Sequence, residues 1–176
     1  MNKMINEEVK YNGKRFNVIQ RVYEKENNFQ YVRECVETRS AVVILTIDTD
    51  KNVYFVKQYR EVIGMETLEL PAGIIDEGEE PIQSARRELE EETGLIAEKM
   101  EYLGEFYPSC GFTNEKIYIF VATDLSQGKE KIDEAEVINS IEKIPLDKCY
   151  EMLKNNELIH ATQNIALSLY YFKFLK

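Results

Sequence analysis

The stretch that decides the fold is Gly73-Ile-Ile-Asp-Glu-Gly-Glu-Glu-Pro-Ile-Gln-Ser-Ala-Arg-Arg-Glu-Leu-Glu-Glu-Glu-Thr-Gly-Leu95. Its second part is typical of a helix, because Pro81 suits the first helical position and Gly94 suits the residue after the last turn. Apolar residues in between recur at helical spacing. The pattern therefore predicts a helix over residues 81–93, with one buried face formed by Ile82, Ala85 and Leu89.

Carboxylates crowd the same stretch. Residues 76–92 hold eight Asp and Glu side chains against two arginines, a net charge of −6 in a chain whose formal charge is −10. On a helix, Glu88, Glu91 and Glu92 would lie within about 5–6 Å of one another between Cβ atoms. A hard divalent cation such as Mg²⁺ or Mn²⁺ would relieve the repulsion between them. A solvated acidic face is the other interpretation, and the run of glutamates by itself favours it.

Short apolar segments surround this helix. Apolar alternation and turn residues predict strands near residues 18–23, 29–36, 41–47, 53–59, 66–70, 102–107, 116–123 and 137–144. Helical spacing predicts two further helices, over residues 146–153 and 161–174. Strands mixed with two or three helices indicate an α/β (α+β) sandwich, and the segment before residue 40 would form a small β unit.

Composition narrows the class of protein. The 176 residues are 44% hydrophobic and 31% charged, which suits one principal globular domain. The strongly acidic balance argues against a nonspecific nucleic-acid binder and against a binder of anionic membranes, since both need a positive surface. The first residues lack the apolar core of a secretory signal, so we expect a cytoplasmic protein.

Cysteine and histidine usage excludes several reaction classes. The three cysteines form no CxxC pair and are odd in number, so free thiols in a reducing compartment are expected. Any serine or cysteine nucleophile activated by histidine, and any histidine-ligated metal, would have to use His160, the single histidine. We expect His160 to be structural, so acid–base and metal chemistry would rest on carboxylates.

Spacing within the acidic stretch matches a known signature. Gly73, five residues, Glu79, seven residues and then Arg87-Glu88-Leu89-Glu90-Glu91-Glu92-Thr93-Gly94-Leu95 follow the pattern of the Nudix hydrolases. A match by chance is on the order of one in a million. The chain therefore resembles this family. The resemblance implies an α/β/α sandwich with a mixed sheet, and a Mg²⁺-dependent hydrolase, with Mn²⁺ as a possible substitute, that acts on nucleoside diphosphate derivatives.

Three further segments resemble the ADP-ribose pyrophosphatase branch of that family: Lys57-Gln-Tyr-Arg60, Leu68-Glu-Leu-Pro-Ala-Gly73 and Tyr107-Pro-Ser-Cys-Gly-Phe-Thr-Asn-Glu115. This resemblance implies hydrolysis of ADP-ribose to AMP and ribose 5-phosphate. It also implies an N-terminal β unit, residues 1–39, that helps to form a homodimer, followed by a catalytic domain, residues 40–176. Cys110 stands where the branch usually has proline, so another ADP-sugar or a sugar nucleotide such as GDP-mannose stays open as the substrate.

The resemblance also assigns roles to single residues. Glu88, Glu92 and the carbonyl of Ala72 would bind the metal, and Arg87 would pair with a carboxylate. Glu79 would support the metal-binding glutamates or complement the helix dipole. The general base would come from the acidic segment 133–136, with Glu134 as the base and Glu136 as a further metal ligand, or with these two roles exchanged. A solvated charged loop is the alternative for that segment.

Substrate contacts follow from the same comparison. Arg60 would bind a phosphate in bidentate fashion, or else form a structural ion pair. The other expected contacts are Glu37, Ile74, Ser109, Cys110, Gly111 and Glu115. A non-catalytic Nudix module that binds a nucleotide is a third hypothesis, but the usual mark of such a module, loss of the glutamates, is not seen in this sequence.

Overall fold

The computed structural model describes residues 2–128 and 138–176 and divides the chain into two units. The smaller unit comprises Met1–Ser40 and Phe106–Ile117, and the larger one comprises Ala41–Glu105 and Tyr118–Lys176. Three strands of the smaller unit pair in antiparallel fashion in the order β1-β2-β3. They are β1 (Lys3–Asn12), β2 (Phe16–Glu24) and β3 (Gln30–Thr38).

The larger unit alternates strands and helices along the chain. Its elements are β4 (Ala41–Thr46), β5 (Asn52–Arg60), β6 (Met65–Glu69), β7 (Ala72–Ile74), α1 (Pro81–Thr93), most of β8 (Leu95–Phe106) and β9 (Ile117–Gln127), β10 (Ile138–Pro145), α2 (Leu146–Lys154), α3 (Ala161–Tyr170) and the π-helical turn η1 (Tyr171–Leu175). Two sheets have the strand orders β7-β4-β9-β8 and β10-β5-β6.

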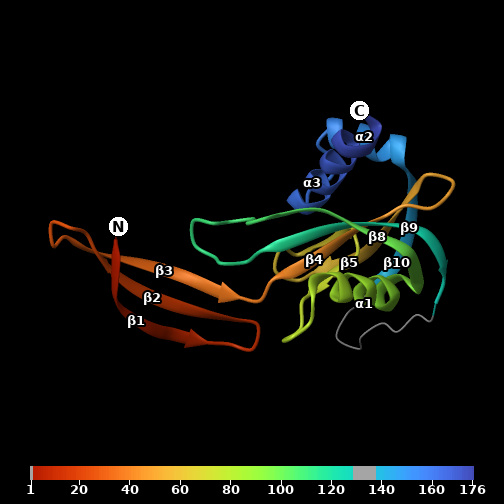
Figure 1. Ribbon diagram of the computed structural model, residues 1–176. Coiled ribbons are helices and arrows are strands. Elements are labelled where there is room, and N and C mark those ends of the chain that lie inside the picture. Colours follow the sequence, from red (N-terminus) through yellow and green to blue (C-terminus); the bar gives the residue numbers. More distant parts are fainter. Residues whose placement is uncertain (1, 129–137) are drawn as a thin grey trace. The chain divides into compact units, whose positions relative to one another are not determined.

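Strand β4 lies between helices on its two faces. Its side chains alternate in direction, as in any strand. Val42 and Ile44 pack in one hydrophobic cluster with Ala85 and Leu89 of α1, while α3 packs against β4 as well. Figure 1 shows α1 on one side of the strands of the larger unit and α2 with α3 on the other. This arrangement confirms the predicted α/β sandwich.

Helix α1 begins and ends where the sequence indicates. Pro81 is its first residue, Glu80 and Gln83 form a capping box at its N-terminus, and Gly94 adopts a left-handed conformation with φ of 68° at its C-terminus. The expected burial of Ile82 is wrong, because this side chain is 41% exposed. Ile82 lies in the first turn, whereas the buried residues of α1 all come later: Ser84, Ala85, Glu88, Leu89, Glu92 and Thr93.

Two strands are not predicted by the sequence pattern. Strand β1 is exposed along its whole length, so it lacks the apolar alternation that marks a half-buried strand. Strand β7 has only three residues and lies just beyond the strand expected near residues 66–70. It nevertheless pairs with β4, with Ala72 opposite Val43. None of the helices in the described ranges has both the length and the apolar character needed to cross a membrane.

Packing of α1 on β4 yields a stability prediction. Leu89→Ala should lower the free energy of unfolding by about 3 kcal/mol, because Leu89 is fully buried and truncation leaves a cavity. Ile82→Ala on the same helix should cost less than about 1 kcal/mol, since its side chain is partly exposed. Urea unfolding followed by circular dichroism measures the free energy of unfolding of both variants. An equal loss in the two variants would contradict the assignment of Leu89 to the core.

Candidate functional site

Two glutamates of α1 are buried against the backbone of β7. The side chains of Glu88 and Glu92 lie one helical turn apart, and the two residues are only 6% and 2% exposed. The backbone N–H of Ala72 donates to Oε2 of Glu92 at 3.1 Å. A Cβ atom built on Gly73 would overlap the carboxylate of Glu88. Only glycine at position 73 therefore lets this carboxylate approach the strand so closely.

Arg87 connects the carboxylates around this site. Its Nη1 donates to Oε1 of Glu88 at 2.6 Å and to Oε2 of Glu91 at 3.0 Å. Its Nε and Nη2 donate to the two carboxylate oxygens of Glu79 at 3.2 and 3.1 Å, and Nη2 also donates to the carbonyl of Ile74 at 3.1 Å. The expectation that Arg87 pairs with carboxylates is therefore confirmed.

Glu79 holds Arg87 from the loop that precedes α1. The hydroxyl of Ser84 and the backbone N–H of Asp76 both donate to this carboxylate. Hydrogen bonds from Arg87 are the main cause that lowers the pKa of Glu79 to about 2, and the same contacts raise the pKa of Arg87. Of the two roles expected for Glu79, the contacts favour support of the other glutamates, since the N-cap of the helix is Glu80.

The donor set suits a hard divalent cation. Glu88 and Glu92 supply carboxylate oxygens at buried positions beside Ala72, and oxygen is the ligand that Mg²⁺ and Mn²⁺ prefer. In the part of the chain that the structure describes, no three His, Cys, Asp or Glu side chains are arranged to hold a metal ion. Glu134 and Glu136, the expected base and additional ligand, lie outside the described residues.

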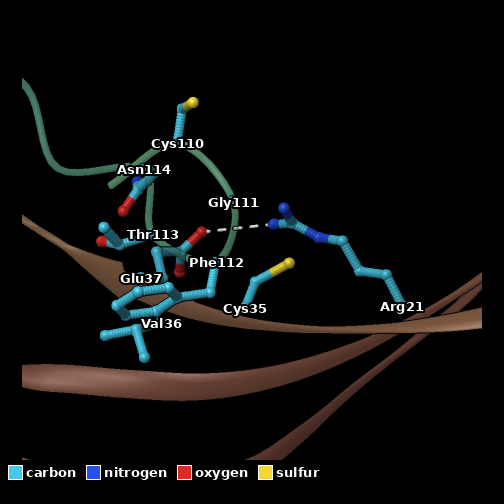
Figure 2. A pocket seen from close by; sticks show the side chains of 9 residues that line it. All are labelled: Arg21, Cys35, Val36, Glu37, Cys110, Gly111, Phe112, Thr113 and Asn114. Atoms are coloured by element: carbon cyan, nitrogen blue, oxygen red, sulfur yellow. Dashed lines mark hydrogen bonds and ion pairs between the residues drawn. The ribbon is translucent and has the colours of Figure 1, made fainter. Parts of the chain in front are cut away.

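A second group of the expected residues meets in the smaller unit. Glu37, Cys110 and Gly111 line one pocket of about 190 Å³, in which Glu37 comes from β3 and the other two from the loop after β8. Figure 2 shows the guanidinium of Arg21 reaching toward the carboxylate of Glu37, whereas the thiol of Cys110 points away from it. The distance between Arg21 Nη2 and Glu37 Oε1 is 3.4 Å.

Arg21 is a pocket residue that sequence reasoning misses. Its Nε pairs with Oε2 of Glu7 at 2.6 Å, and this hydrogen bond raises the pKa of Arg21. Glu7 and Arg21 stand opposite each other on β1 and β2. The sequence signals this pair only through charged residues that alternate along two neighbouring strands. Such a pattern does not identify which charges meet until the register between the strands is known.

Ser109 and Glu115, also expected at the substrate, shape the loop around this pocket rather than line it. The carbonyl of Ser109 accepts hydrogen bonds from the backbone N–H groups of Phe112 and Thr113, at 3.2 and 3.1 Å. The backbone N–H of Glu115 donates to the hydroxyl of Thr113 at 3.1 Å. Neither residue lines the pocket, so a role for Ser109 and Glu115 in substrate binding stays a prediction.

Arg60 takes part in an ion pair within the larger unit. Its Nε and Nη2 donate to the two carboxylate oxygens of Glu69, both at 2.7 Å. His160, the N-cap residue of α3, lies with Nε2 3.4 Å from Oε1 of the same glutamate. Of the two interpretations left open for Arg60, the structure displays the ion pair. Glu69 carries no local sequence signal as a partner of Arg60, because the β5–β6 hairpin brings the two residues together.

Comparison with known proteins now decides the family. A family model described as the NUDIX domain matches residues 37–163, which include the whole acidic stretch. The chain belongs to the Nudix hydrolase family.

The three cysteines, Cys35, Cys110 and Cys149, are free thiols, as the sequence predicts.

Relatives of this Nudix chain agree with the ADP-ribose pyrophosphatase branch. An ADP-ribose pyrophosphatase of Bacillus subtilis (strain 168) is 33% identical over 94% of this chain and 90% of that protein. A methanol dehydrogenase activator of Bacillus methanolicus is 36% identical over 77% of this chain and 74% of that protein. A crystal structure of an ADP compounds hydrolase matches with a TM-score of 0.85 and 28% identity, over 96% of this chain and 91% of the other.

The contacts of Glu79 give a prediction about pH. Its pKa is about 2 in the folded chain and 4.5 for an ordinary glutamate, so its ionised form adds stability above pH 4.5, and this contribution is lost as the pH falls toward 2. Glu79→Gln should therefore be less stable than the wild type at pH 7, and the difference should shrink at acid pH. Urea midpoints recorded without metal from pH 7 downward test this.

Glu77→Gln is the matched control for this experiment, because Glu77 is an exposed residue in the same loop. Its difference from the wild type should stay small and constant with pH. A Glu79→Gln deficit that stays the same at acid pH would contradict the assigned role of the Arg87 pair.

Proposed function

We propose that this Nudix hydrolase cleaves the diphosphate linkage of a nucleoside diphosphate derivative in the cytoplasm, with ADP-ribose as the leading substrate and AMP and ribose 5-phosphate as products. The observation that carries the proposal is the pair of buried carboxylates, Glu88 and Glu92, held against β7 by Ala72 and Gly73. Two of the relatives are named for hydrolysis of ADP-ribose or of ADP compounds, which supports the choice of substrate.

In this proposal the larger unit holds the metal. Glu88, Glu92 and the carbonyl of Ala72 would bind Mg²⁺, or Mn²⁺ in its place, and Glu136 would add a further carboxylate. A bound divalent ion neutralises phosphate charge and lowers the pKa of a coordinated water. Arg87 orients Glu88 through a contact of 2.6 Å, and Glu79 keeps Arg87 in place. Glu134 would accept the proton of the attacking water, or would exchange roles with Glu136.

The resemblance to the ADP-ribose pyrophosphatase branch supplies the proposed substrate contacts. Arg60 would bind a phosphate of the diphosphate, and Ile74 would contact the substrate next to the metal-binding strand. Glu37 would make a peripheral contact with the substrate, and Glu115 would accept a hydrogen bond from a ribose hydroxyl. The remaining contacts would come from the loop after β8, through Ser109, Cys110 and Gly111.

A second candidate substrate follows from Cys110. This cysteine lines the same pocket as Glu37 and Gly111, and it replaces the proline that the branch usually has there. Cysteine lacks the ring that fixes the backbone of proline, so this replacement changes the shape and the backbone freedom of the loop. Another ADP-sugar, or a sugar nucleotide such as GDP-mannose, is therefore the alternative to ADP-ribose.

Activity assays test the proposal. The purified chain with MgCl₂ should hydrolyse ADP-ribose with a higher kcat/KM than other ADP-sugars, GDP-mannose or NADH, and the products should be AMP and ribose 5-phosphate. Glu92→Gln should lower kcat by about two orders of magnitude or more, because it removes a metal-binding carboxylate while the fold survives. Glu90→Gln, on the same helix but outside the proposed ligand set, is the matched control.

Each outcome of this assay discriminates between hypotheses. Preference for another substrate of the panel would keep the chemistry and move attention to the loop that carries Cys110. Glu134→Gln should slow the reaction without weakening Mn²⁺ binding, whereas Glu136→Gln should do both. Normal turnover by Glu92→Gln would overturn the metal assignment, and nucleotide binding without turnover would favour the non-catalytic module.

We also propose that the small sheet forms a homodimer. By strand alternation and register, Tyr11, Val18, Val22 and Val32 share one face of the sheet. Tyr11 is 56% and Val32 is 47% exposed in the single chain. Exposed apolar side chains gathered on one face of a three-stranded sheet are a typical surface for association with another protein. The resemblance to the ADP-ribose pyrophosphatase branch favours a second copy of this chain as the partner.

Light scattering should therefore give twice the mass of one chain. Val32→Lys should shift the mass toward the monomer, because it introduces a charge into the proposed interface. Val62→Lys makes the same exchange at a valine of the larger unit that is 99% exposed, and it should leave the dimer intact. A monomeric wild type, or a dimer that survives Val32→Lys, would contradict the proposed interface.

A further inference from the structure

Glu69 receives more polar contacts than a simple surface ion pair needs. Arg60 donates to both of its carboxylate oxygens, each at 2.7 Å. The hydroxyl of Thr67, two residues earlier on β6, donates to Oε1 at 2.5 Å, and His160 lies 3.4 Å from the same oxygen. Bidentate geometry fixes the plane of a guanidinium, so Glu69 restricts Arg60 to one orientation.

Burial differs sharply between the two partners of this pair. The side chain of Glu69 is 8% exposed, whereas that of Arg60 is 39% exposed. Burial by itself would raise the pKa of Glu69, but hydrogen bonds from Arg60 and Thr67 outweigh it and leave this pKa below its usual value. The glutamate is therefore an internal anchor, and the arginine is the member of the pair that reaches solvent.

The pair also lies close to the metal-binding strand in the chain. Glu69 is the last residue of β6, and Ala72 is the first residue of β7. Three residues of fully extended chain span at most about 11 Å between Cα atoms. In the proposed function, a phosphate bound through a metal ion at Glu88 and Glu92 would thus lie near the guanidinium that Glu69 anchors, and arginine is well suited to phosphate groups.

We infer that Glu69 is a positioning residue for the proposed reaction, which holds the guanidinium of Arg60 in the orientation that binds a phosphate of the diphosphate substrate, and that Thr67 holds Glu69 in turn. This inference rests on the proposed function and adds two residues to it. In this role Glu69 would not contact the substrate itself. Its effect on the reaction passes through Arg60 alone, and this distinguishes it from a residue that merely stabilises the fold.

Kinetics of Glu69→Gln provide the test. The exchange keeps the shape of the side chain but removes its charge, so Arg60 loses its fixed orientation. The KM for the preferred substrate of the panel should rise about tenfold while kcat changes little, because a contact made equally in ground state and transition state affects KM. Thr67→Val should shift KM in the same direction by a smaller factor, and it is the second variant if Glu69→Gln folds poorly.

A double substitution separates positioning from stability. In an Arg60→Ala background, which should itself raise KM, adding Glu69→Gln should change KM no further, because the two residues act as one unit. Glu66→Gln is the matched control. Glu66 lies on the same strand, pairs with Lys57 at 3.2 Å and is partly exposed, so this variant should keep KM within about twofold.

The possible results are distinct. Absence of turnover by the wild-type chain on every substrate would overturn both the proposed function and this inference. Turnover by the wild type with a KM that Glu69→Gln leaves unchanged would overturn the inference alone. An equal rise of KM in the wild-type and Arg60→Ala backgrounds would do so too, since the effect would then not pass through Arg60.

Discussion

Helix α1 tolerates several neighbouring carboxylates because Arg87 forms hydrogen bonds with them. One guanidinium contacts Glu79, Glu88 and Glu91 and also the backbone of Ile74. Without such compensation, like charges one turn apart would destabilise the helix, and their burial would be more costly still. The other requirement is Gly73, because any side chain at this position would occupy the space of the Glu88 carboxylate.

From this constraint the chemistry of the site follows. Arg87 donates a hydrogen bond to Glu88 and the backbone N–H of Ala72 donates one to Glu92, so both carboxylates are held in place. The same hydrophobic cluster that packs α1 on β4 thus also places Glu88 and Glu92 against β7. The stability of the core and the geometry of the proposed metal ligands therefore depend on one contact surface.

The two units use charge in different ways. In the larger unit, the buried carboxylate of Glu69 anchors its ion pair with Arg60 and fixes the orientation of the guanidinium. In the smaller unit, Arg21 bridges Glu7 and Glu37 on an open sheet, where both carboxylates are partly exposed. Exposed pairs of this kind contribute little to stability, so their value lies in arranging the pocket that Glu37 shares with the loop after β8.

Much of the fold and part of the site could be predicted from the sequence. Helix α1 was predicted over residues 81–93, because the signals that begin and end a helix are local. The signature from Gly73 to Leu95 also identified the family, since its spacing is specific. Ile82 was misplaced by the same reasoning, because burial depends on which turn of the helix meets the sheet.

Only the tertiary structure decided which charged groups meet. The partners of Arg60 and of Arg21 lie on neighbouring strands, and strand register is not encoded in short-range patterns. The close approach of Glu88 to Gly73 likewise requires α1 to be docked on the sheet before it becomes visible. By itself the sequence determined the helix, the acidic signature and the family, because these are patterns along the chain; the tertiary structure decided the pairing of charges, because electrostatic contacts act through space.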